Sequence, residues 1–422
     1  MTSRAAAALP AAAWTAAVLA VVAAASPTAA AGVGPASAQA TTTAPAAAPG
    51  PASADDARSS VQRAVRWLLE KQNPDGSWGT STVESLFELQ YSNASFHAWK
   101  VAGGALSFMA LRVVDETPER RAALEKALSY LCSQEPPKRG NDWDIDSNWT
   151  ALYAFVALVD AARDPRFAGE PWKTRVAERG RDYYRVLEAT QEPLGGWGYY
   201  EGPVVSRRPT WSTSFATACV IPALVAARDE LGWPVDAKVV ERAVKYVDRC
   251  RLPNGAVSYD LDAIPRIDGG ENINQVKGSL GRIQVANWAL RRAGVPSVTD
   301  ERIRWGVEQF FENHRFLDAA RLKPVPHESW YANAGYFYFF GHYHAALAIQ
   351  ELPEAERAAL HARLRGHLVK AQWDDGSSVD FPGSFYCWTA STSFSVLALE
   401  AGLHPERFPA SRRARAGAEA AR

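Results

Sequence analysis

The sequence lacks an excess of charge of either sign and contains few cysteines. Its 422 residues include 46 Lys and Arg against 46 Asp and Glu, and only 4 Cys. A balanced charge provides no basic surface for a nucleic acid, so no nucleic-acid partner is expected. With 47% hydrophobic and 22% charged residues, the composition excludes a disordered chain and a polytopic membrane protein. We therefore expect a globular protein with a large core.

The two ends of the chain have the composition of unfolded segments. Arg4 is followed by the Ala-rich apolar run 5–25 and by small-residue sites near residue 38, which indicates a signal peptide over 1–38. A secreted or periplasmic location is therefore expected, with an N-terminal membrane anchor as the alternative. The Ala, Pro and Thr-rich stretch 39–54 reads as a disordered linker, and residues 406–422 read as a disordered basic tail.

A helix-to-loop pattern recurs between these ends. The clearest copy ends in Gln72-Asn-Pro-Asp-Gly-Ser-Trp78, and equivalent positions follow at residues 134, 191, 251, 314 and 372. The spacing predicts six repeats of about sixty residues. Each repeat reads as two helices, of which the first is amphipathic and the second is apolar nearly all round, as in 150–158, 214–221 and 393–399.

Six amphipathic helices alternating with six enclosed ones predict two concentric layers, an all-α (α/α)6 toroid over residues 55–405. The links from inner to outer helices are short, as at 115–118 and 351–353, whereas the links from outer to inner helices are long. Long loops gathered on one rim are where binding and chemistry usually occur, so we expect the functional site on this long-loop rim.

The cysteines fall at separated places in this arrangement. Cys132 and Cys250 lie at the ends of non-adjacent outer helices, and Cys219 and Cys387 lie on inner helices three repeats apart. A disulfide needs Cα atoms within about 7 Å, so we expect buried free thiols.

The Gln-Asn-Pro-Asp-Gly-Ser-Trp segment at 72–78 and Gly195-Gly-Trp-Gly198 resemble the glutamine–tryptophan repeat of squalene and hopene cyclases. The same α/α toroid is shared by protein prenyltransferase β subunits and complement thioester domains. The resemblance covers about residues 56–405 and implies a single, divergent toroid. In this family the Gln and Trp tie an outer helix end to the following loop, so they imply architecture and not catalysis.

The resemblance also implies candidate catalytic residues. Class II terpene cyclases protonate an alkene with the middle acid of an Asp-x-Asp-Asp-Thr-Ala segment, and the corresponding loop here contains Asp142, Asp144 and Asp146, with Ser147 in place of the third acid. The zinc ligands of prenyltransferases have no match, because Asp260-Leu-Asp262 lacks an adjacent Cys and Cys387 stands where a His would be expected. No metal and no cofactor are therefore expected.

The three aspartates alternate, which in an extended loop would place them all on one side. Close carboxylates raise one another's pKa, and a raised pKa is what a general acid needs. The alternative is a solvated acidic loop in which Asp146 or Ser147 caps the next helix.

Candidate ligand-binding residues surround the same rim. The segment 330–344 is rich in aromatic residues, whose faces stabilise a carbocation or stack on a sugar, although the spacing of Tyr336, Phe340 and Tyr343 equally fits core packing. His342 and His344 are two apart on a helix and cannot share a ligand, so a lone core histidine is the alternative for each. The full set of ligand-binding candidates is Trp149, Arg208, Trp211, His327, Trp330, Tyr331, Phe337, His344 and Trp388.

Three functions remain open from the sequence. The first is a divergent terpene cyclase or isoprenoid-binding protein with Asp144 or Asp146 as proton donor, which requires an acid that faces an aromatic cavity. The second is a noncatalytic module that binds a lipid or a partner at the rim, with a membrane surface among the candidates. The third is a carbohydrate-active lyase or hydrolase with two facing carboxylates. The second predicts a packed or shallow centre. In general we expect an apolar or polymeric ligand in the central cavity or at the long-loop rim, and a monomer.

Overall fold

A computed structural model describes residues 49–80, 83, 88, 91–136, 139–206, 208–261, 271–409 and 411. The predicted signal peptide 1–38 and the parts 39–48 and 412–422 of the predicted linker and tail lie outside the described residues. All described residues belong to one compact unit, 47–422. Nowhere in these described stretches is a helix long and apolar enough to cross a membrane.

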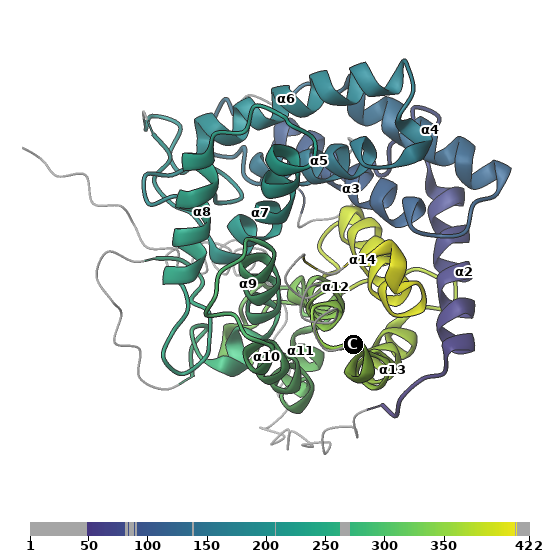
Figure 1. The fold of residues 1–422 in the computed structure, drawn as a ribbon, viewed down its shortest axis with the longest axis vertical. Helices are drawn as coiled ribbons and strands as arrows, with labels where there is room; N and C mark the ends of the chain where they lie inside the picture. The colour runs from purple at the N-terminus through teal and green to yellow at the C-terminus, as the bar shows by residue number, and fades with distance from the viewer. Residues whose placement is uncertain are drawn as a thin grey trace, which may run out of the picture. The chain divides into compact units, whose positions relative to one another are not determined.

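Two layers of helices alternate along the described chain. The outer helices are α2 (Ala54–Lys71), α4 (Pro118–Ser133), α6 (Trp172–Thr190), α8 (Ala237–Arg249), α10 (Asp300–Glu312) and α13 (Glu354–Ala371). The inner helices are α3 (Asn93–Arg112), α5 (Asn148–Ala162), α7 (Ser214–Asp229), α9 (Leu280–Arg292), α12 (Phe337–Gln350) and α14 (Phe385–Leu403). Each inner helix packs against the next, and α14 packs against α3, so the inner ring closes (Figure 1). The predicted (α/α)6 toroid is confirmed.

The two kinds of helix are buried as their patterns predict. In α2, the Ser53 side chain accepts a hydrogen bond from the Asp56 backbone N–H, and the Asp56 side chain accepts one from the Ser53 N–H. This capping box starts the helix, and Val61, Val65 and Leu68 bury one face. By contrast, every residue of α12 is buried, as expected for a helix enclosed on all sides. One short helix in the link from α10 to α12, α11 (Arg315–Ala320), does not follow the two-helix pattern.

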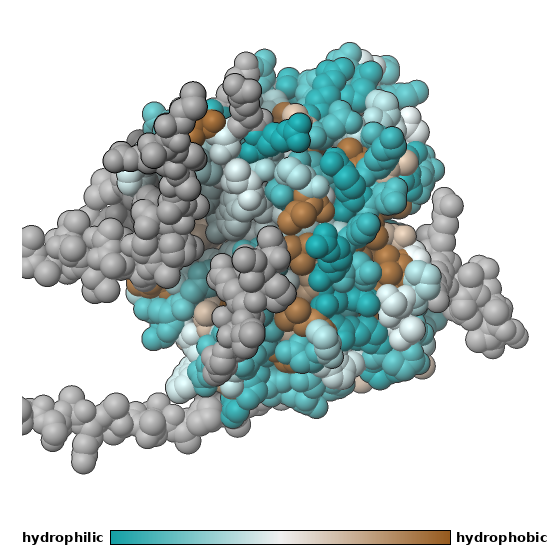
Figure 2. Space-filling view, turned by 90° about the vertical axis from the view of Figure 1, so that its left-hand side faces the viewer, coloured by the Kyte–Doolittle hydropathy of each residue, from teal (hydrophilic) through white to brown (hydrophobic). Residues whose placement is uncertain are grey.

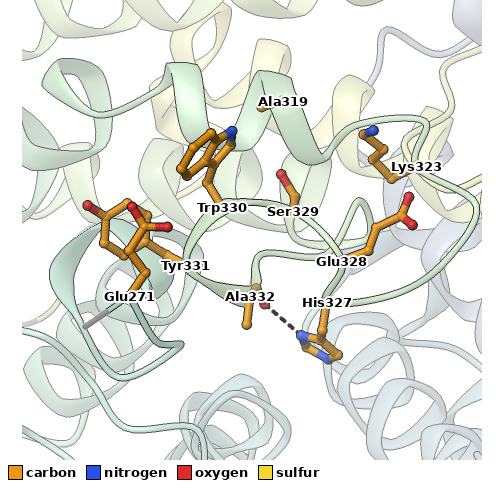
Figure 3. Close-up of a pocket in the computed structure, with 9 residues that line it drawn as sticks. All are labelled: Glu271, Ala319, Lys323, His327, Glu328, Ser329, Trp330, Tyr331 and Ala332. Carbon is orange, nitrogen blue, oxygen red and sulfur yellow. Dashed lines mark hydrogen bonds between the residues drawn. The ribbon is translucent and has the colours of Figure 1, made fainter. Parts of the chain in front are cut away.

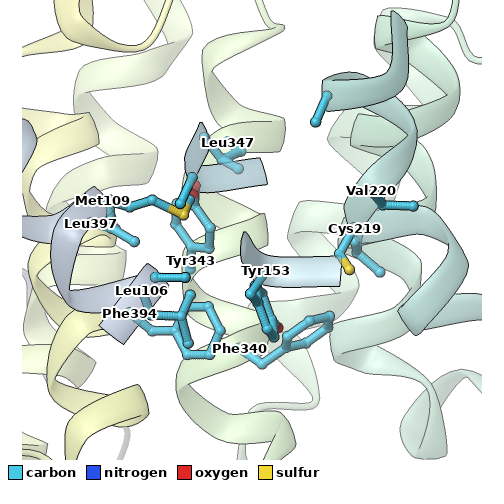
Figure 4. Packing of buried hydrophobic residues seen from close by; sticks show 14 of the residues in the cluster. Leu106, Met109, Tyr153, Cys219, Val220, Phe340, Tyr343, Leu347, Phe394 and Leu397 are labelled. Carbon is cyan, nitrogen blue, oxygen red and sulfur yellow. The ribbon is translucent and has the colours of Figure 1, made fainter. Parts of the chain in front are cut away.

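Aromatic rings from different inner helices meet in the middle of the inner ring (Figure 4). The Phe394 ring of α14 lies 6.1 Å from Tyr153 of α5, 6.0 Å from Phe340 and 5.6 Å from Tyr343 of α12, between ring centroids. These are ordinary separations for edge-to-face and stacked pairs. Within the aromatic stretch 336–347, the rings that meet here therefore pack in the core of the toroid.

The repeat glutamines and tryptophans hold neighbouring repeats together. Each of three glutamine Nε2 groups donates to a carbonyl four residues later and to a carbonyl in a neighbouring outer helix: Gln72 to Gly76 and Ala123, Gln191 to Gly195 and Val239, Gln372 to Gly376 and Ser60. The indole N–H groups of Trp78 and Trp197 donate to the carbonyls of Leu68 and Leu187, at 2.8 and 2.7 Å. The implied architectural role of this motif agrees with these contacts.

The glycine of the same motif is required by its backbone conformation. Gly195 has a φ of 112°, and a Cβ at this position would lie 2.4 Å from the Arg242 carbonyl oxygen of α8. Gly376 is equivalent, with a φ of 90° and a contact to the Arg63 carbonyl of α2. The turn therefore lies directly against the next outer helix, where only glycine fits without strain.

Replacing Gln372 by leucine is expected to destabilise the protein by about 1–3 kcal/mol, because the buried carbonyl groups of Ser60 and Gly376 lose their donor. The loss of stability is expected to be largest at Gln372, because this residue joins the last outer helix, α13, to the first, α2. Gln134 is the matched control, since its amide donates only to Ser133 next to it. Urea unfolding of the Gln372→Leu and Gln134→Leu variants measures the difference in their free energies of unfolding. Equal losses of stability would contradict a role of Gln372 in joining the two helices.

The folded part extends beyond the predicted boundaries at 55 and 405. The Ala52 N–H donates to the Ala362 carbonyl in α13 at 3.2 Å, so the end of the predicted linker packs on the toroid. At the other end, the Arg407 guanidinium donates to the Val113 carbonyl at 2.6 Å, and the Ser411 N–H donates to Glu351 at 3.1 Å. Neither stretch is rich in large apolar residues, and both are held by hydrogen bonds that involve backbone groups, which composition does not reveal.

The four cysteines are all free thiols, as predicted. Cys132, Cys219 and Cys250 are buried, whereas Cys387 near the start of α14 is only partly buried. The expectation that all four are buried is therefore wrong for Cys387, because the helix begins at the long-loop rim.

Candidate functional site

The three alternating aspartates lie in the link before α5, but they do not point to one side. Asp142 is exposed, where it accepts a hydrogen bond from the Val204 N–H at 2.8 Å. Asp144 is buried and turns back on its own loop. Asp146 points into the toroid, where the Trp99 indole N–H donates to its carboxylate at 2.9 Å. The expected one-sided arrangement is wrong, because this loop is a series of turns and not an extended strand.

Asp144 holds the loop together as a carboxylate. It accepts hydrogen bonds from the Gly140 N–H at 2.6 Å, from the Asn141 N–H at 3.0 Å and from the Ser92 hydroxyl. Burial acts to raise the pKa of Asp144, but the hydrogen bonds from Ser92, Gly140 and Asn141 outweigh it and hold this pKa below its usual range. An acid that has lost its proton at neutral pH is a poor proton donor, so this geometry favours Asp146.

Asp146 has the properties of a general acid. Burial raises its pKa to about 6, although hydrogen bonds from the Trp99 and Trp149 indoles partly oppose the shift. The residue as a whole nevertheless stays partly accessible. Its backbone φ is 65°, a left-handed conformation that costs a non-glycine residue about 1–3 kcal/mol and often marks a functional position. The Ser95 hydroxyl donates to the neighbouring Ile145 carbonyl at 2.6 Å and holds this turn.

Aromatic side chains surround this acid. The Trp149 ring stacks on Tyr199, with centroids 6.2 Å apart and an angle of 7° between the planes. Burial raises the pKa of both Tyr199 and Tyr336 well above the usual range, and the nearby Asp146 charge adds to each shift. We call Asp146, Trp99, Trp149, Tyr199 and Tyr336 the acid cluster.

Hydrogen bonds connect the acid cluster to His327 at the rim. The Tyr199 and Tyr259 hydroxyls lie 3.4 Å apart, and Tyr259 is hydrogen-bonded to Tyr336. The Tyr336 hydroxyl is 2.8 Å from Nε2 of His327, whose Nδ1 lies 2.7 Å from the Ala332 carbonyl. A carbonyl only accepts, so Nδ1 carries the hydrogen and Nε2 accepts from the tyrosine. Burial lowers the pKa of His327, which keeps this ring neutral.

A pocket of about 600 Å³ opens beside His327 on the long-loop rim (Figure 3). It brings together three predicted ligand-binding residues, His327, Trp330 and Tyr331, with Glu271 and Glu328. Trp330 is 61% exposed. Trp330 and Tyr331 lie in a 3-10 turn before α12, and His327, Tyr331 and Ala332 all have positive φ values. Both carboxylates and the exposed indole suit a polar ligand rather than an apolar one.

The other predicted ligand-binding residues are dispersed. Trp211 packs edge-on against Tyr199 at 4.9 Å, and Phe337 packs against Phe215 at 5.2 Å. Arg208 is exposed at a second rim pocket of about 160 Å³, apart from the acid cluster. Trp388 is partly buried beside Trp373.

His344 is 2% exposed, and its Nδ1 lies 2.8 Å from the Phe340 carbonyl. Burial also lowers the pKa of His344 to about 3, and its ring packs as a core residue. The position of His344 therefore does not support a role in ligand binding.

Three further residues in the links that lead from outer to inner helices were not predicted from the sequence. Tyr199, Tyr259 and Asp380 each stand four residues after a repeat glycine, at 195, 255 and 376. Asp380 is 4% exposed, and burial raises its pKa to about 7 despite hydrogen bonds from Ser391 and the Phe339 N–H. The position is common to these three repeats when they are aligned on their glycines.

Large hydrophobic side chains on the surface also concentrate on the long-loop rim. The side of the domain seen in Figure 2 is mainly hydrophilic, with small hydrophobic groups between the polar ones. Among the described residues, the exposed large hydrophobic side chains all lie in links that lead from an outer to an inner helix: Val83, Trp143, Leu194, Val204, Val205, Leu322, Val325, Trp330 and Trp373. The rim that carries Asp146 is therefore also the more apolar end.

Comparison with known proteins finds this fold in a terpene cyclase and in a carbohydrate-active enzyme. No protein-family profile matches the chain. A drimenyl diphosphate synthase from Streptantibioticus cattleyicolor is 26% identical over 199 residues, which cover 47% of this chain and 32% of that enzyme. The match thus spans about a third of the curated relative.

Among solved structures, the type II terpene cyclase MstE from Scytonema has a TM-score of 0.50 and 15% identity, covering 83% of this chain and 99% of that one. The GH76A α-1,6-mannanase from Salegentibacter has a TM-score of 0.50 and 13% identity, covering 83% and 98%.

The chain has the α/α toroid of the terpenoid cyclase type, as the repeat motifs indicate. The same architecture also hosts a mannanase, so the fold alone does not select a reaction.

Proposed function

We propose that this protein is a divergent class II terpenoid cyclase in which Asp146 is the general acid. The observation that carries the proposal is a carboxyl group with a pKa of about 6 among aromatic rings, in a residue that stays partly accessible. At pH 7 about a tenth of such an acid keeps its proton, roughly a hundredfold more than of an ordinary exposed aspartate. The partial match to drimenyl diphosphate synthase supports the same class of chemistry.

The proposed step is the transfer of the Asp146 proton to a carbon–carbon double bond of an isoprenoid. The π electrons form the new C–H bond, the more substituted carbon becomes a cation, and Asp146 is left as a carboxylate. An internal double bond then closes the ring, and a later loss of a proton balances the first step. The faces of Trp149 and Tyr199 lie beside the acid, where aromatic quadrupoles stabilise positive charge.

The backbone of the site supports this role. The left-handed turn at Asp146 is held by contacts to residues of α3 and its N-terminal cap, so the acid is positioned before a substrate enters. The apolar side chains on the same rim suit the entry of an apolar substrate.

Linear isoprenoid diphosphates with 10, 15 and 20 carbons, and squalene, are the probes for this proposal. The full chain is incubated with each in D2O, and the products are analysed by mass spectrometry after removal of the diphosphate. We expect a cyclic product that contains one deuterium and has lost one double bond for each ring closed. A product that forms without deuterium uptake would contradict protonation as the first step.

The rim pocket supports a second candidate, binding or cleavage of a carbohydrate. An exposed Trp330 beside Glu271 and Glu328 is a suitable surface for a sugar ring. If this pocket binds sugars, Trp330→Ala is expected to weaken the binding of an oligosaccharide roughly 2- to 10-fold. Trp373→Ala is the matched control, because Trp373 is 45% exposed elsewhere on the same rim. Calorimetric titration with mannan and uronic-acid oligosaccharides measures this, and equal affinities of both variants would remove this candidate.

A further inference from the structure

Three histidines from different segments meet between the inner and outer helices, away from the acid cluster. His314 directly precedes α11, His342 lies in α12, and His367 lies in α13. One ring nitrogen of each lies within 4.8 Å of the corresponding nitrogens of the other two. The residues are 2%, 0% and 5% exposed, respectively. We call them the histidine cluster.

The hydrogen bonds of two of these rings determine where their protons lie. Nδ1 of His342 is 2.7 Å from the Tyr338 carbonyl oxygen, which can only accept, so this nitrogen carries hydrogen. Nδ1 of His314 is 2.9 Å from the Asp318 carboxylate, which accepts in the same way.

The opposite nitrogens of these two rings then face each other. Nε2 of His314 and Nε2 of His342 are 3.0 Å apart. In neutral rings that carry hydrogen on Nδ1, both Nε2 atoms present lone pairs, and two lone pairs at this distance repel each other. A positive species between them, either a proton or a metal ion, would remove the repulsion.

The three rings are enclosed by the protein. The charged groups near them are Arg321, Arg363, Lys370 and Asp318. Rings of Phe310, Phe311 and Tyr338 enclose the remaining sides.

The three converging nitrogens suit a metal ion of the zinc type. Three neutral imidazoles are a common ligand set for such ions, with metal–nitrogen distances of about 2.0–2.1 Å. Those distances correspond to nitrogens about 3.4 Å apart around a tetrahedral ion, so the rings, whose nitrogens lie within 4.8 Å of one another, would move closer together to bind it. Hydrogen bonds from the outer nitrogens to a carboxylate and to a carbonyl, as at His314 and His342, are what typically orient metal-binding histidines.

We propose that His314, His342 and His367 form a binding site for a divalent transition-metal ion, of which Zn²⁺ is the best-fitting example. The ion joins α12 of the inner layer to α13 of the outer layer and to the start of α11. Its position between the layers gives it a structural role, separate from the proposed reaction. The expectation from the sequence of no metal and of a lone core histidine at 342 is revised by this arrangement.

Cobalt binding to the full chain, produced without a polyhistidine tag, tests this site. The protein is treated with a chelator and then titrated with Co²⁺, whose visible absorption reports nitrogen coordination. We expect one equivalent to bind, to be displaced by Zn²⁺, and Zn²⁺ to raise the midpoint of thermal unfolding. Asp318→Asn is expected to weaken Co²⁺ binding about 10- to 100-fold, because it removes the carboxylate that orients His314.

His367→Gln should abolish this Co²⁺ absorption, and His361→Gln should retain it. His361 is a matched control, because it lies in the same helix, is 3% exposed and is hydrogen-bonded to Gln350 outside the cluster. Equal binding by both variants would overturn the proposal. If His367→Gln does not fold, the wild-type titration decides alone, and failure to bind one equivalent would show that a proton occupies the cluster.

Discussion

Asp146→Asn is expected to lower the rate of isoprenoid conversion by about 10²- to 10⁴-fold, the usual contribution of a general acid. Asparagine has nearly the same shape, accepts the Trp99 hydrogen bond through its carbonyl oxygen and tolerates the left-handed backbone at this position. The variant should therefore fold normally and keep its affinity for the substrate. Product formation under single-turnover conditions measures the loss.

The same residue should impose a pH dependence. The acid must be protonated to react, so the rate should fall as the pH rises through the pKa of about 6 of Asp146. The folded-state pKa is raised above the ordinary value of 3.8, so the stability contributed by the protonated form is present at low pH and is lost as the pH rises through about 6. Asp146→Asn should therefore be up to about 3 kcal/mol more stable than the wild type above this pH.

Asp142→Asn is the matched control for both measurements. It lies in the same loop, but its side chain is exposed and hydrogen-bonded to the Val204 backbone. We expect its rate and its stability to remain close to those of the wild type. If both variants lose the same activity, or if Asp146→Asn keeps full activity, Asp146 is not the acid.

Trp197→Ala is expected to destabilise the fold by about 3–5 kcal/mol. The Trp197 side chain is fully buried, its indole N–H donates to the Leu187 carbonyl, and its backbone N–H donates to the Thr217 hydroxyl at 2.8 Å. Truncation leaves a large cavity between α6 and α7 and removes the donor for the Leu187 carbonyl.

Trp143→Ala provides the comparison, because Trp143 is 57% exposed and its removal should change the free energy of unfolding by less than about 0.5 kcal/mol. Urea unfolding followed by far-ultraviolet circular dichroism measures both variants without relying on tryptophan fluorescence. A loss below about 1 kcal/mol for Trp197→Ala would mean that the motif is not central to the packing of the repeats.

Part of the candidate site could be predicted from the sequence, because its local pattern is informative. The resemblance to the cyclase motif singles out the Asp loop, and the position of His327 just before an inner helix places it on the long-loop rim. Trp330 and Tyr331 were expected in the inner helical segment, whereas they lie in a turn before α12. Which aspartate faces the interior could not be predicted. That choice depends on Ser92 and Ser95, about fifty residues away, which hold the turn in place.

The remaining site residues were missed for a related reason. Tyr199, Tyr259 and Asp380 occupy one repeated position, but two are tyrosines and the third is an aspartate, so no single residue type marks this position. Likewise, His314, His342 and His367 are 28 and 25 residues apart and come from three segments. Only their packing around α12 brings the ring nitrogens together.

The sequence by itself determined the architecture of this protein. In each of the six repeats, a helix with one apolar face alternates with a helix that is apolar nearly all round, and such helices have few ways to bury their apolar surfaces. Glycines at equivalent turns repeat the same contact with the next outer helix. A closed double ring of helices therefore follows from the periodicity. The tertiary structure decided which polar groups are desolvated and which lie together. The pKa of Asp146 and the facing nitrogens of the histidine cluster depend on neighbours from distant segments, and such neighbours are established only when the ring closes.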